Sequence, residues 1–370
     1  MDPRVLEAMI PYLSDQFGNA ASVHHSFGRN AKEAVENSRK ILANKINARP
    51  KEIVFTSGAT ESINLAIRGI CEKSPEKGHI ITQATEHKAV LDTCDAMVKK
   101  GWSITVLPVD MDGRVDPSHV KDAIRNDTVL VAIMHANNEI GTIQPMAEIG
   151  EICHGNGVLF LVDASQTFGK LDIDVNALHI DLLAATAHKI YGPKGIGLLY
   201  VNGKNPKVKM TSQITGGGHE YGLRSGTLPV HQVVGFGKAI EICDPNENEK
   251  LAILQKMLID GIVAAHPDVQ LNGSREYGLE NNINASFSGL DAETIISKMK
   301  GIACSIGSAC STANLEPSHV LKAIGLKNEI AHSSIRFSLG RFNTKEEIIN
   351  AIDEINRIVS EMKDKSPRNL

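Results

Sequence analysis

The chain has 370 residues, of which 42% are hydrophobic and 22% charged, and its formal net charge is −4. This composition excludes an intrinsically disordered chain, and without a basic block there is no electrostatic basis for binding nucleic acid. No stretch approaches the roughly 20 apolar residues that span a bilayer, the first residues lack a signal-peptide pattern, and the 6 scattered cysteines form no disulfide framework. We therefore expect a cytoplasmic protein of two domains that binds neither nucleic acid nor membrane.

The first half of the chain alternates helical periodicity with short apolar runs. Apolar residues at helical spacing predict a helix over 31–46, and a β-branched run at 52–56 is followed by a second predicted helix over 61–70. Further strand candidates are 79–82, 104–108, 128–135, 158–162, 182–185 and 196–201. Several are continuously apolar, as in strands covered on both faces. The pattern predicts an α/β fold with a mainly parallel sheet, whose functional site lies beyond the carboxyl ends of the strands.

A polar stretch with a proline, at 243–249, marks a change of character. Beyond it the sequence predicts a helix over 250–265, a strand over 282–287 and helices over 292–300 and 345–363. We place the domain boundary here. Residues 1–245 form the large domain and residues 246–370 a smaller α+β domain, with the N-terminal segment open to assignment to either one.

Polar residues follow several of the apolar runs. Ser57-Gly58-Ala59-Thr60 lies between a strand and a helix, where its N–H groups can hold a phosphate or form an ordinary turn and N-cap. Asp163 ends another run. A carboxylate there requires a partner, which is a cationic ring nitrogen, a helix N-terminus or a structural ion pair.

Two nucleophile candidates complete the set. Lys189 follows a further apolar run, where an amine of depressed pKa can form a Schiff base, although most lysines are simply solvated. Lys194 lies in a Pro-Gly turn and is expected to face solvent. Cys310 lies among Ser and Gly residues, a setting more typical of a reactive thiol than of a buried one. A phosphate turn, an acid for a ring nitrogen and a Schiff-base lysine are together the parts of a pyridoxal 5'-phosphate (PLP) enzyme.

Several segments resemble, in family order, the cysteine desulfurases of the IscS/NifS type, within the class V aminotransferase group of fold-type I PLP enzymes. They run from Phe17 nearly to the C-terminus and read TSGATESINLAIRG, TEHKAVLDTC, HANNEIGTIQP, VDASQTFGKL, AHKIYGPKGIGLLYV, GGGHEYGLRSGTLPVHQ, GSACSTANLEPSHVL and AHSSIRFSLGRF. The resemblance implies the PLP-dependent transferase fold of type I, with helices on both faces of the large-domain sheet. It also implies removal of sulfur from L-cysteine, giving L-alanine and an enzyme persulfide. The sulfur would go to iron–sulfur cluster assembly or to other acceptors.

The resemblance also implies roles for single residues. Cys310 matches the nucleophile, Lys189 the Schiff-base lysine, and His87 the imidazole that stacks on the cofactor ring and moves protons. Arg336 matches the guanidinium that binds the substrate carboxylate, assisted by Asn138. The remaining matches are cofactor contacts, on the phosphate side Ala59, Thr60, Thr186 and His188, and on the ring side Asn138, Asp163 and Gln166.

Partner contacts follow from the same comparison. Thr227 matches a residue that reaches the phosphate of the neighbouring subunit, which implies a homodimer. The long loop around Cys310 is typical of the flexible-loop group, in which the thiolate can pass sulfur to a scaffold protein or share a transient [2Fe-2S] cluster with it. Cys304 is expected to be a core residue or a resolving thiol.

The chain departs from the family pattern in two places. Thr186 stands where the bacterial enzymes often have Ser, which keeps the hydroxyl. The family usually begins earlier, with a segment resembling YLDYSATTP, so cofactor retention and turnover are less firmly implied than the fold. Two alternatives to a cysteine desulfurase therefore stay open. One is a selenocysteine lyase or another class V PLP enzyme, and the other is a truncated non-catalytic homologue that acts as a binding partner.

Overall fold

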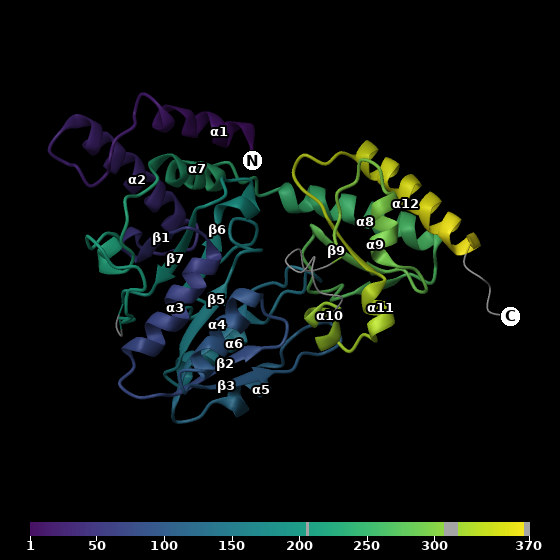
Figure 1. Ribbon diagram of the computed structural model, residues 1–370, viewed down its shortest axis with the longest axis horizontal. Coiled ribbons are helices and arrows are strands. Elements are labelled where there is room, and N and C mark those ends of the chain that lie inside the picture. The colour runs from purple at the N-terminus through teal and green to yellow at the C-terminus, as the bar shows by residue number, and fades with distance from the viewer. Residues whose placement is uncertain (205–206, 307–316, 366–370) are drawn as a thin grey trace. The chain divides into compact units, whose positions relative to one another are not determined.

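The computed structural model describes residues 1–204, 207–306 and 317–365 (Figure 1). These residues form two compact units. The first comprises Met1–Leu107, Pro117–His135 and Pro145–Asp244, and the second comprises Pro108–Asp116, Ala136–Gln144 and the chain from Pro245 onward. The sequence analysis placed one boundary after residue 245 and did not foresee that two earlier stretches join the second unit.

A seven-stranded sheet forms the centre of the first unit (Figure 1). Its spatial order is β1-β7-β6-β5-β4-β2-β3, and every strand except β7 runs in the same direction, so the expected mainly parallel sheet is confirmed. The strands are β1 Ile53–Thr56, β2 His79–Gln83, β3 Ser103–Leu107, β4 Thr128–Met134, β5 Leu159–Asp163, β6 Leu182–Thr186 and β7 Gly197–Val201.

Helices cover both faces of this sheet. Val54 and Leu199 belong to the apolar core beneath α3 and α4, whereas their neighbours Phe55 and Leu198 are buried on the opposite face. Because side chains alternate along a strand, full burial of these strands requires a layer on each side. The helices of the first unit are α1 Pro3–Met9, α2 Ser26–Asn44, α3 Ala59–Lys73, α4 Lys88–Val98, α5 Pro117–Ala123, α6 Met146–Gly155 and α7 Val230–Glu241, with 3₁₀ turns η1 Ile10–Leu13, η2 Pro50–Glu52, η3 Ala187–Ile190 and η4 Glu220–Gly222.

Capping side chains explain where two of these helices begin. The helix expected from residue 31 begins at Ser26, because Nδ1 of His25 accepts the N–H of Gly28 at 3.1 Å. In the same way Nδ1 of His87 accepts the N–H of Ala89 at 3.0 Å and begins α4. Apolar periodicity alone does not carry this information, since a cap lies outside the periodic segment.

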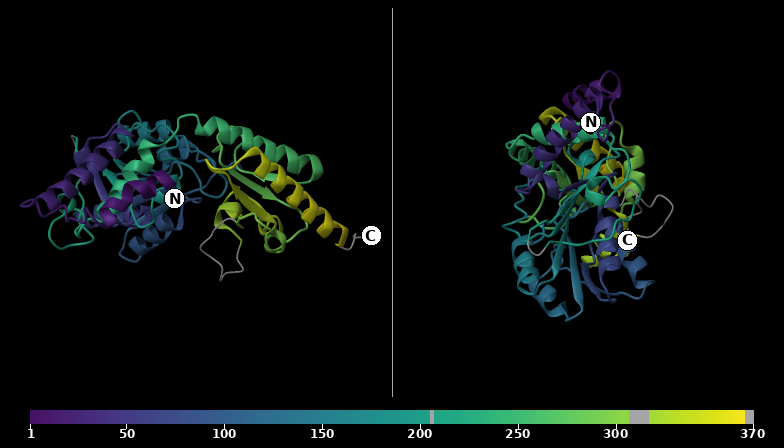
Figure 2. Two further views of the ribbon diagram at one scale, coloured as in Figure 1. Left: turned by 90° about the horizontal axis from the view of Figure 1, so that it is seen from above. Right: turned by 90° about the vertical axis from the view of Figure 1, so that its left-hand side faces the viewer.

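The second unit contains a three-stranded antiparallel sheet in the order β10-β9-β8. The long helices α8 and α12 pack against each other, and α9 and the sheet complete an apolar core (Figure 2). The elements are β8 Gln270–Asn272, β9 Asn282–Ser286, β10 Ser334–Ser338, α8 Glu247–Ala265, α9 Ala292–Lys298, α10 His319–Ala323, α11 Asn328–His332 and α12 Lys345–Lys365. Within the described ranges, no helix combines the length and apolarity that crossing a membrane requires.

Candidate functional site

Polar residues of the first unit gather at one edge of the seven-stranded sheet. Thr56 at the end of β1 and Thr186 at the end of β6 both pair with Gly197, the first residue of β7. Asp163 at the end of β5 pairs with Ala184 of β6 and with Met134 of β4. The carboxyl ends of four strands therefore meet along this edge, where a doubly wound sheet places its ligands.

The turn Ser57–Thr60 forms a cradle at the N-terminus of α3. Gly58 has φ 156°, and a Cβ built on it would lie 4.0 Å from Oγ1 of Thr186, so this turn and the end of β6 face one space. Ser62 fixes the cradle to the sheet through a bond from its Oγ to the carbonyl of Leu198 at 2.8 Å. The first N–H groups of a helix have no partner within the helix, and they favour an anion.

Asp163 presents a buried carboxyl group at this edge. Asp163 is 6% exposed, and its Oδ1 accepts both the N–H of Ser165 at 2.9 Å and the hydroxyl of Ser165 at 2.5 Å. The carbonyl of Asp163 accepts the N–H of His135 at 2.9 Å. The two bonds from Ser165 fix the orientation of the carboxyl group, which suits a cationic partner such as a pyridinium nitrogen. Gln166, three residues further on, is half-buried.

Thr186, His188 and Lys189 lie where β6 passes into η3. Oγ1 of Thr186 and Nδ1 of His188 share a hydrogen bond of 2.9 Å. Partial burial, with the positive charges of Lys189 and Lys194, lowers the pKa of His188 and favours the neutral form of its imidazole. Both lysine side chains are exposed, but Lys189 belongs to η3 at the sheet edge whereas Lys194 belongs to the turn before β7.

His87 begins α4 beyond the end of β2. Its Nδ1 is engaged by the N–H of Ala89, which leaves Nε2 as the ring nitrogen for contact with a ligand. The residue before it, Glu86, is fully buried and accepts the N–H of Met134 at 2.5 Å through Oε1. Burial raises the pKa of Glu86 well above its usual value, and the charge of Asp163 raises it further.

Sequence reasoning missed Glu86, Ser165 and His135. The only sequence signal for Glu86 was its position directly before His87. The sequence does not show that Glu86 is buried, or that the charge of Asp163 is near enough to raise its pKa. Burial lowers the pKa of His135 to about 4, and its Nδ1 has no hydrogen-bond partner within the described structure.

The second unit brings Arg336 and Asn138 together. Nη1 of Arg336 donates to the carbonyl of Asn138 at 2.9 Å, and the backbones of Arg336 and Ser305 exchange hydrogen bonds. Burial lowers the pKa of Arg336, although the nearby charge of Glu139 acts in the opposite direction, and a guanidinium remains charged in any case. Cys304 is half-buried, and burial raises the pKa of its thiol to about 11. Cys310 lies outside the described residues.

Thr227 is exposed and follows a loop that η4 interrupts. Among the described residues, no cluster of histidine, cysteine, aspartate or glutamate side chains has the arrangement of a metal site.

The residues of the first unit fit a PLP molecule. The cradle at Gly58 lies at a helix N-terminus, which favours an anion, and the hydroxyl of Thr186 borders the same space. The buried carboxyl group of Asp163 has the charge that suits a ring cation. Lys189 follows on the same segment as Thr186 and supplies an amine.

Comparison with known proteins gives the same assignment. Residues 1–350 match the model of the family described as aminotransferase class-V. The chain is 50% identical to proteins named cysteine desulfurase IscS from Escherichia coli O139:H28 and from Shigella boydii serotype 18, over 99% of this chain and 92% of theirs.

Several solved structures are also similar to this chain. One named NifS-like protein matches with a TM-score of 0.90 and 35% identity over 98% of this chain and 96% of its own. SspA in complex with cysteine matches with a TM-score of 0.84 and 39% identity over 93% and 97%. The NifS-like protein from Rickettsia africae matches with a TM-score of 0.86 and 31% identity over 97% and 96%. The chain thus belongs to the aminotransferase class-V family, among the relatives of the IscS and NifS-like cysteine desulfurases.

Proposed function

We propose that this protein is a PLP-dependent cysteine desulfurase that takes sulfur from L-cysteine, releases L-alanine and carries the sulfur as a persulfide on Cys310. The observation that carries the proposal is the meeting of a phosphate cradle, a buried aspartate and a lysine at one sheet edge. The 50% identity to cysteine desulfurases over nearly the whole chain supports this reaction over the others of the class V group.

We propose separate roles for the residues that would contact the cofactor. When bound, PLP supplies an electron sink that weakens the bonds at the α-carbon of the substrate. Lys189 would attach the cofactor through its amine, Asp163 would pair with the ring nitrogen, and His87 would stack on the ring. The other contacts are Ala59, Thr60, Thr186 and His188 at the phosphate and Asn138 and Gln166 near the ring oxygen.

Protons and substrate are handled by residues that the structure holds in place. His87 uses Nδ1 as an acceptor at the start of α4, so Nε2 is the nitrogen left to contact the reacting groups, and His87 is the residue that we propose moves protons there. Arg336 would bind the carboxylate of L-cysteine through two parallel hydrogen bonds, and the carbonyl of Asn138 orients its guanidinium.

Cys310 performs the sulfur transfer. Its thiolate forms a bond to the sulfur of the substrate while the carbon–sulfur bond breaks, and protonation of the carbon gives L-alanine. The thiol of Cys304, whose pKa of about 11 keeps it protonated at neutral pH, is a poor substitute for that thiolate. From Cys310 the sulfur passes to an acceptor protein. An iron–sulfur scaffold is the acceptor that we propose, with Cys310 as a temporary ligand of a [2Fe-2S] cluster.

Two further assignments belong to this proposal. The protein forms a homodimer in which the exposed Thr227 of each subunit completes the phosphate site of the other. It works in the cytoplasm, where a reducing environment keeps cysteines as thiols. Cys71, Cys94 and Cys153 are buried thiols in the structure.

Borohydride reduction of the purified protein, followed by peptide mapping, tests the cofactor assignment. We expect the reduced adduct on Lys189, and we expect Lys189→Ala to lose it while the matched control Lys194→Ala keeps it. An adduct on Lys194 contradicts the assignment. A purified protein that shows no visible absorbance of bound cofactor would instead favour a non-catalytic homologue.

Mass spectrometry after a pulse of L-cysteine tests the nucleophile. We expect one additional sulfur on Cys310, no additional sulfur in Cys310→Ala, and an unchanged result in Cys304→Ala. Analysis of the products separates a desulfurase from an aminotransferase, since only the desulfurase forms L-alanine together with sulfide. Sulfur found on Cys304 would contradict the proposal.

A further inference from the structure

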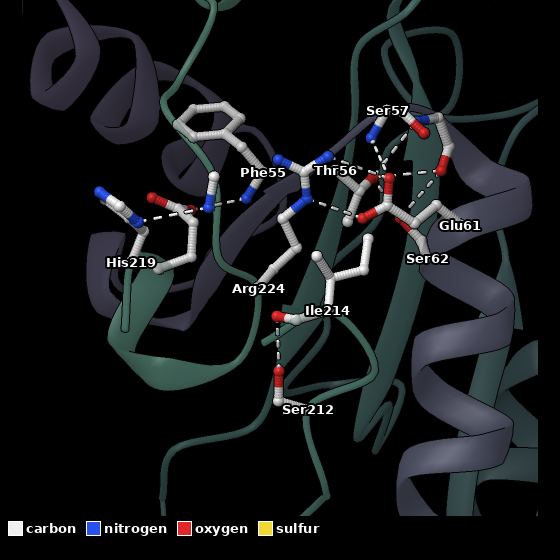
Figure 3. A network of polar contacts seen from close by, with 12 residues as sticks. Phe55, Thr56, Ser57, Glu61, Ser62, Ser212, Ile214, His219 and Arg224 are labelled. Atoms are coloured by element: carbon white, nitrogen blue, oxygen red, sulfur yellow. Dashed lines mark hydrogen bonds and ion pairs between the residues drawn. The ribbon is translucent and has the colours of Figure 1, made fainter. Parts of the chain in front are cut away.

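The ion pair between Glu61 and Arg224 lies beside the turn that we assign to the cofactor phosphate. Glu61 is in the first turn of α3, and its Oε2 accepts the N–H of Ser57 at 2.8 Å. Nε of Arg224 donates to Oε1 at 2.8 Å, and Nη2 donates to Oε2 at 3.3 Å. The two side chains are 19% and 17% exposed for Arg224 and Glu61, so water screens the pair only in part. Figure 3 shows the guanidinium and the turn approaching the carboxylate from two sides.

The negative charge of Glu61 disfavours the binding of a phosphate at this position. Burial acts to raise the pKa of Glu61, but hydrogen bonds from Arg224 and Ser57 outweigh burial and lower it, so the carboxylate is ionised at neutral pH. A helix N-terminus attracts anions, and a carboxylate in the first turn therefore competes with a phosphate for the same N–H groups. It also repels a phosphate of the same sign.

The loop that carries Arg224 is itself firmly held. The N–H of Ser225 donates to the carbonyl of Ile214 at 3.0 Å, and the N–H of Gly226 donates to Nδ1 of His219 at 3.2 Å. On the other side of Arg224, the N–H of Leu223 donates to the carbonyl of Glu220 at 3.0 Å. These bonds fix the backbone on both sides of Arg224 and so hold its guanidinium beside Glu61.

We propose that Arg224 is a positioning residue for the phosphate of the cofactor, which neutralises Glu61 and holds its carboxylate as the acceptor for Ser57. The inference rests on the proposed function, because it requires PLP at this sheet edge. Its distinctive consequence is selectivity for the ligand's phosphate. Loss of Arg224 weakens the binding of a phosphorylated ligand and leaves the binding of the bare ring unchanged.

Equilibrium binding to the cofactor-free full-length protein tests this selectivity. The ligands are PLP, pyridoxal, which lacks the phosphate, and inorganic phosphate. For Arg224→Gln we expect the dissociation constants of PLP and inorganic phosphate to rise about tenfold and that of pyridoxal to change by less than about twofold.

Further variants separate charge from folding. Glu61→Gln combined with Arg224→Gln is expected to restore most of the PLP affinity, since the amide oxygen can still accept from Ser57 without a negative charge. Arg224→Lys retains the positive charge but loses the two-point contact with Glu61, so its PLP affinity is expected to lie between those of the unaltered protein and Arg224→Gln. Arg341→Gln is the matched control, because Arg341 and Glu247 form a pair that is also largely buried, at 9% and 15% exposed, in the second unit.

The outcomes distinguish this inference from the proposed function. An equal loss of PLP and pyridoxal affinity in Arg224→Gln overturns the inference, because it would show that Arg224 merely supports the loop. An unchanged PLP affinity overturns it as well. If the unaltered protein takes up no PLP, the proposed function fails and the inference fails with it.

Discussion

The buried pair of Arg39 and Glu220 offers a quantitative test of what holds the first unit together. Nη1 and Nη2 of Arg39 each donate to one carboxylate oxygen of Glu220 at 2.8 Å, and both side chains are 3% exposed. The N–H of Phe55 also donates to Glu220, at 2.7 Å, and Nη1 of Arg39 donates to the carbonyl of Ile53 at 2.7 Å. The pair thus connects α2 and β1 with η4, since Glu220 lies 181 residues after Arg39 and 165 residues after Phe55.

Glu220→Gln removes the negative charge but keeps an oxygen that can accept from Phe55. The guanidinium of Arg39 then loses its buried carboxylate partner and keeps the more exposed carboxylate of Glu36, 3.2 Å from its Nε. Breaking a buried pair in this way costs about 3–5 kcal/mol. The amide retains part of the hydrogen bonding, so we expect a loss near the lower limit, about 3 kcal/mol. Adding Arg39→Met removes the buried positive charge, and the double variant is expected to be more stable than Glu220→Gln alone.

Urea unfolding of the cofactor-free protein measures these differences. Trp102 is the single tryptophan and is 4% exposed in the core of the first unit, so its fluorescence reports on the unit that contains the pair. Lys100→Gln is the control, because Lys100 and Glu72 form an exposed pair in the same unit, and it is expected to cost less than about 1 kcal/mol. A loss below about 1 kcal/mol for Glu220→Gln, or a double variant that is no more stable, would refute the reasoning.

Three further predictions concern the site. Gly197→Ala would place a Cβ 2.6 Å from Cα of Gly58, so the phosphate cradle must shift, and we expect PLP affinity, followed by absorbance titration, to fall at least about tenfold; an unchanged affinity contradicts this. Burial lowers the pKa of His135 to about 4, so the unfolded chain binds an extra proton between its ordinary pKa of about 6.5 and pH 4. The free energy of unfolding should therefore decrease as pH falls through this window, and His135→Gln should reduce the slope, which urea unfolding at several pH values will measure. Arg336→Lys loses bidentate binding of the substrate carboxylate and should raise KM for L-cysteine about tenfold with a smaller change in kcat; steady-state kinetics with the reverse pattern would contradict its assignment.

Apolar runs were sufficient to locate the strands of the large sheet. The strand expected at 128–135 is β4, Thr128–Met134, and the strand expected at 182–185 is β6, Leu182–Thr186. These runs are buried on both faces, so their composition identifies them. The opposite direction of β7 was not predictable in this way, because the burial of a strand does not depend on its direction. β10, Ser334–Ser338, was missed because its short alternating pattern is weaker than a continuous apolar run.

For the site, the order of polar residues after the strands identified the phosphate turn, Asp163 and Lys189 as candidates. It did not identify Glu61 or Arg224, because a charged residue in a helix or loop is usually solvated and their pairing spans 163 residues of sequence. The buried ion pair of Arg39 was not predictable for the same reason, since its partner Glu220 lies 181 residues away in the sequence. Long-range ion pairs become apparent only in three dimensions.

The discontinuous second unit has a consequence for synthesis of the protein on the ribosome. The stretch Ala136–Gln144 leaves the exit tunnel well before most of the unit to which it belongs. Ile140 is 4% exposed in the finished structure, where its apolar cluster includes Val320, Leu321 and Ile324. Until those residues are translated, Ile140 has no such core to enter, and the nascent chain must present it to water or to a chaperone. Pairing across so long a stretch of sequence is also intrinsically slow. The second unit should therefore acquire its native packing only after translation has passed α10, even if the seven-stranded sheet of the first unit forms earlier.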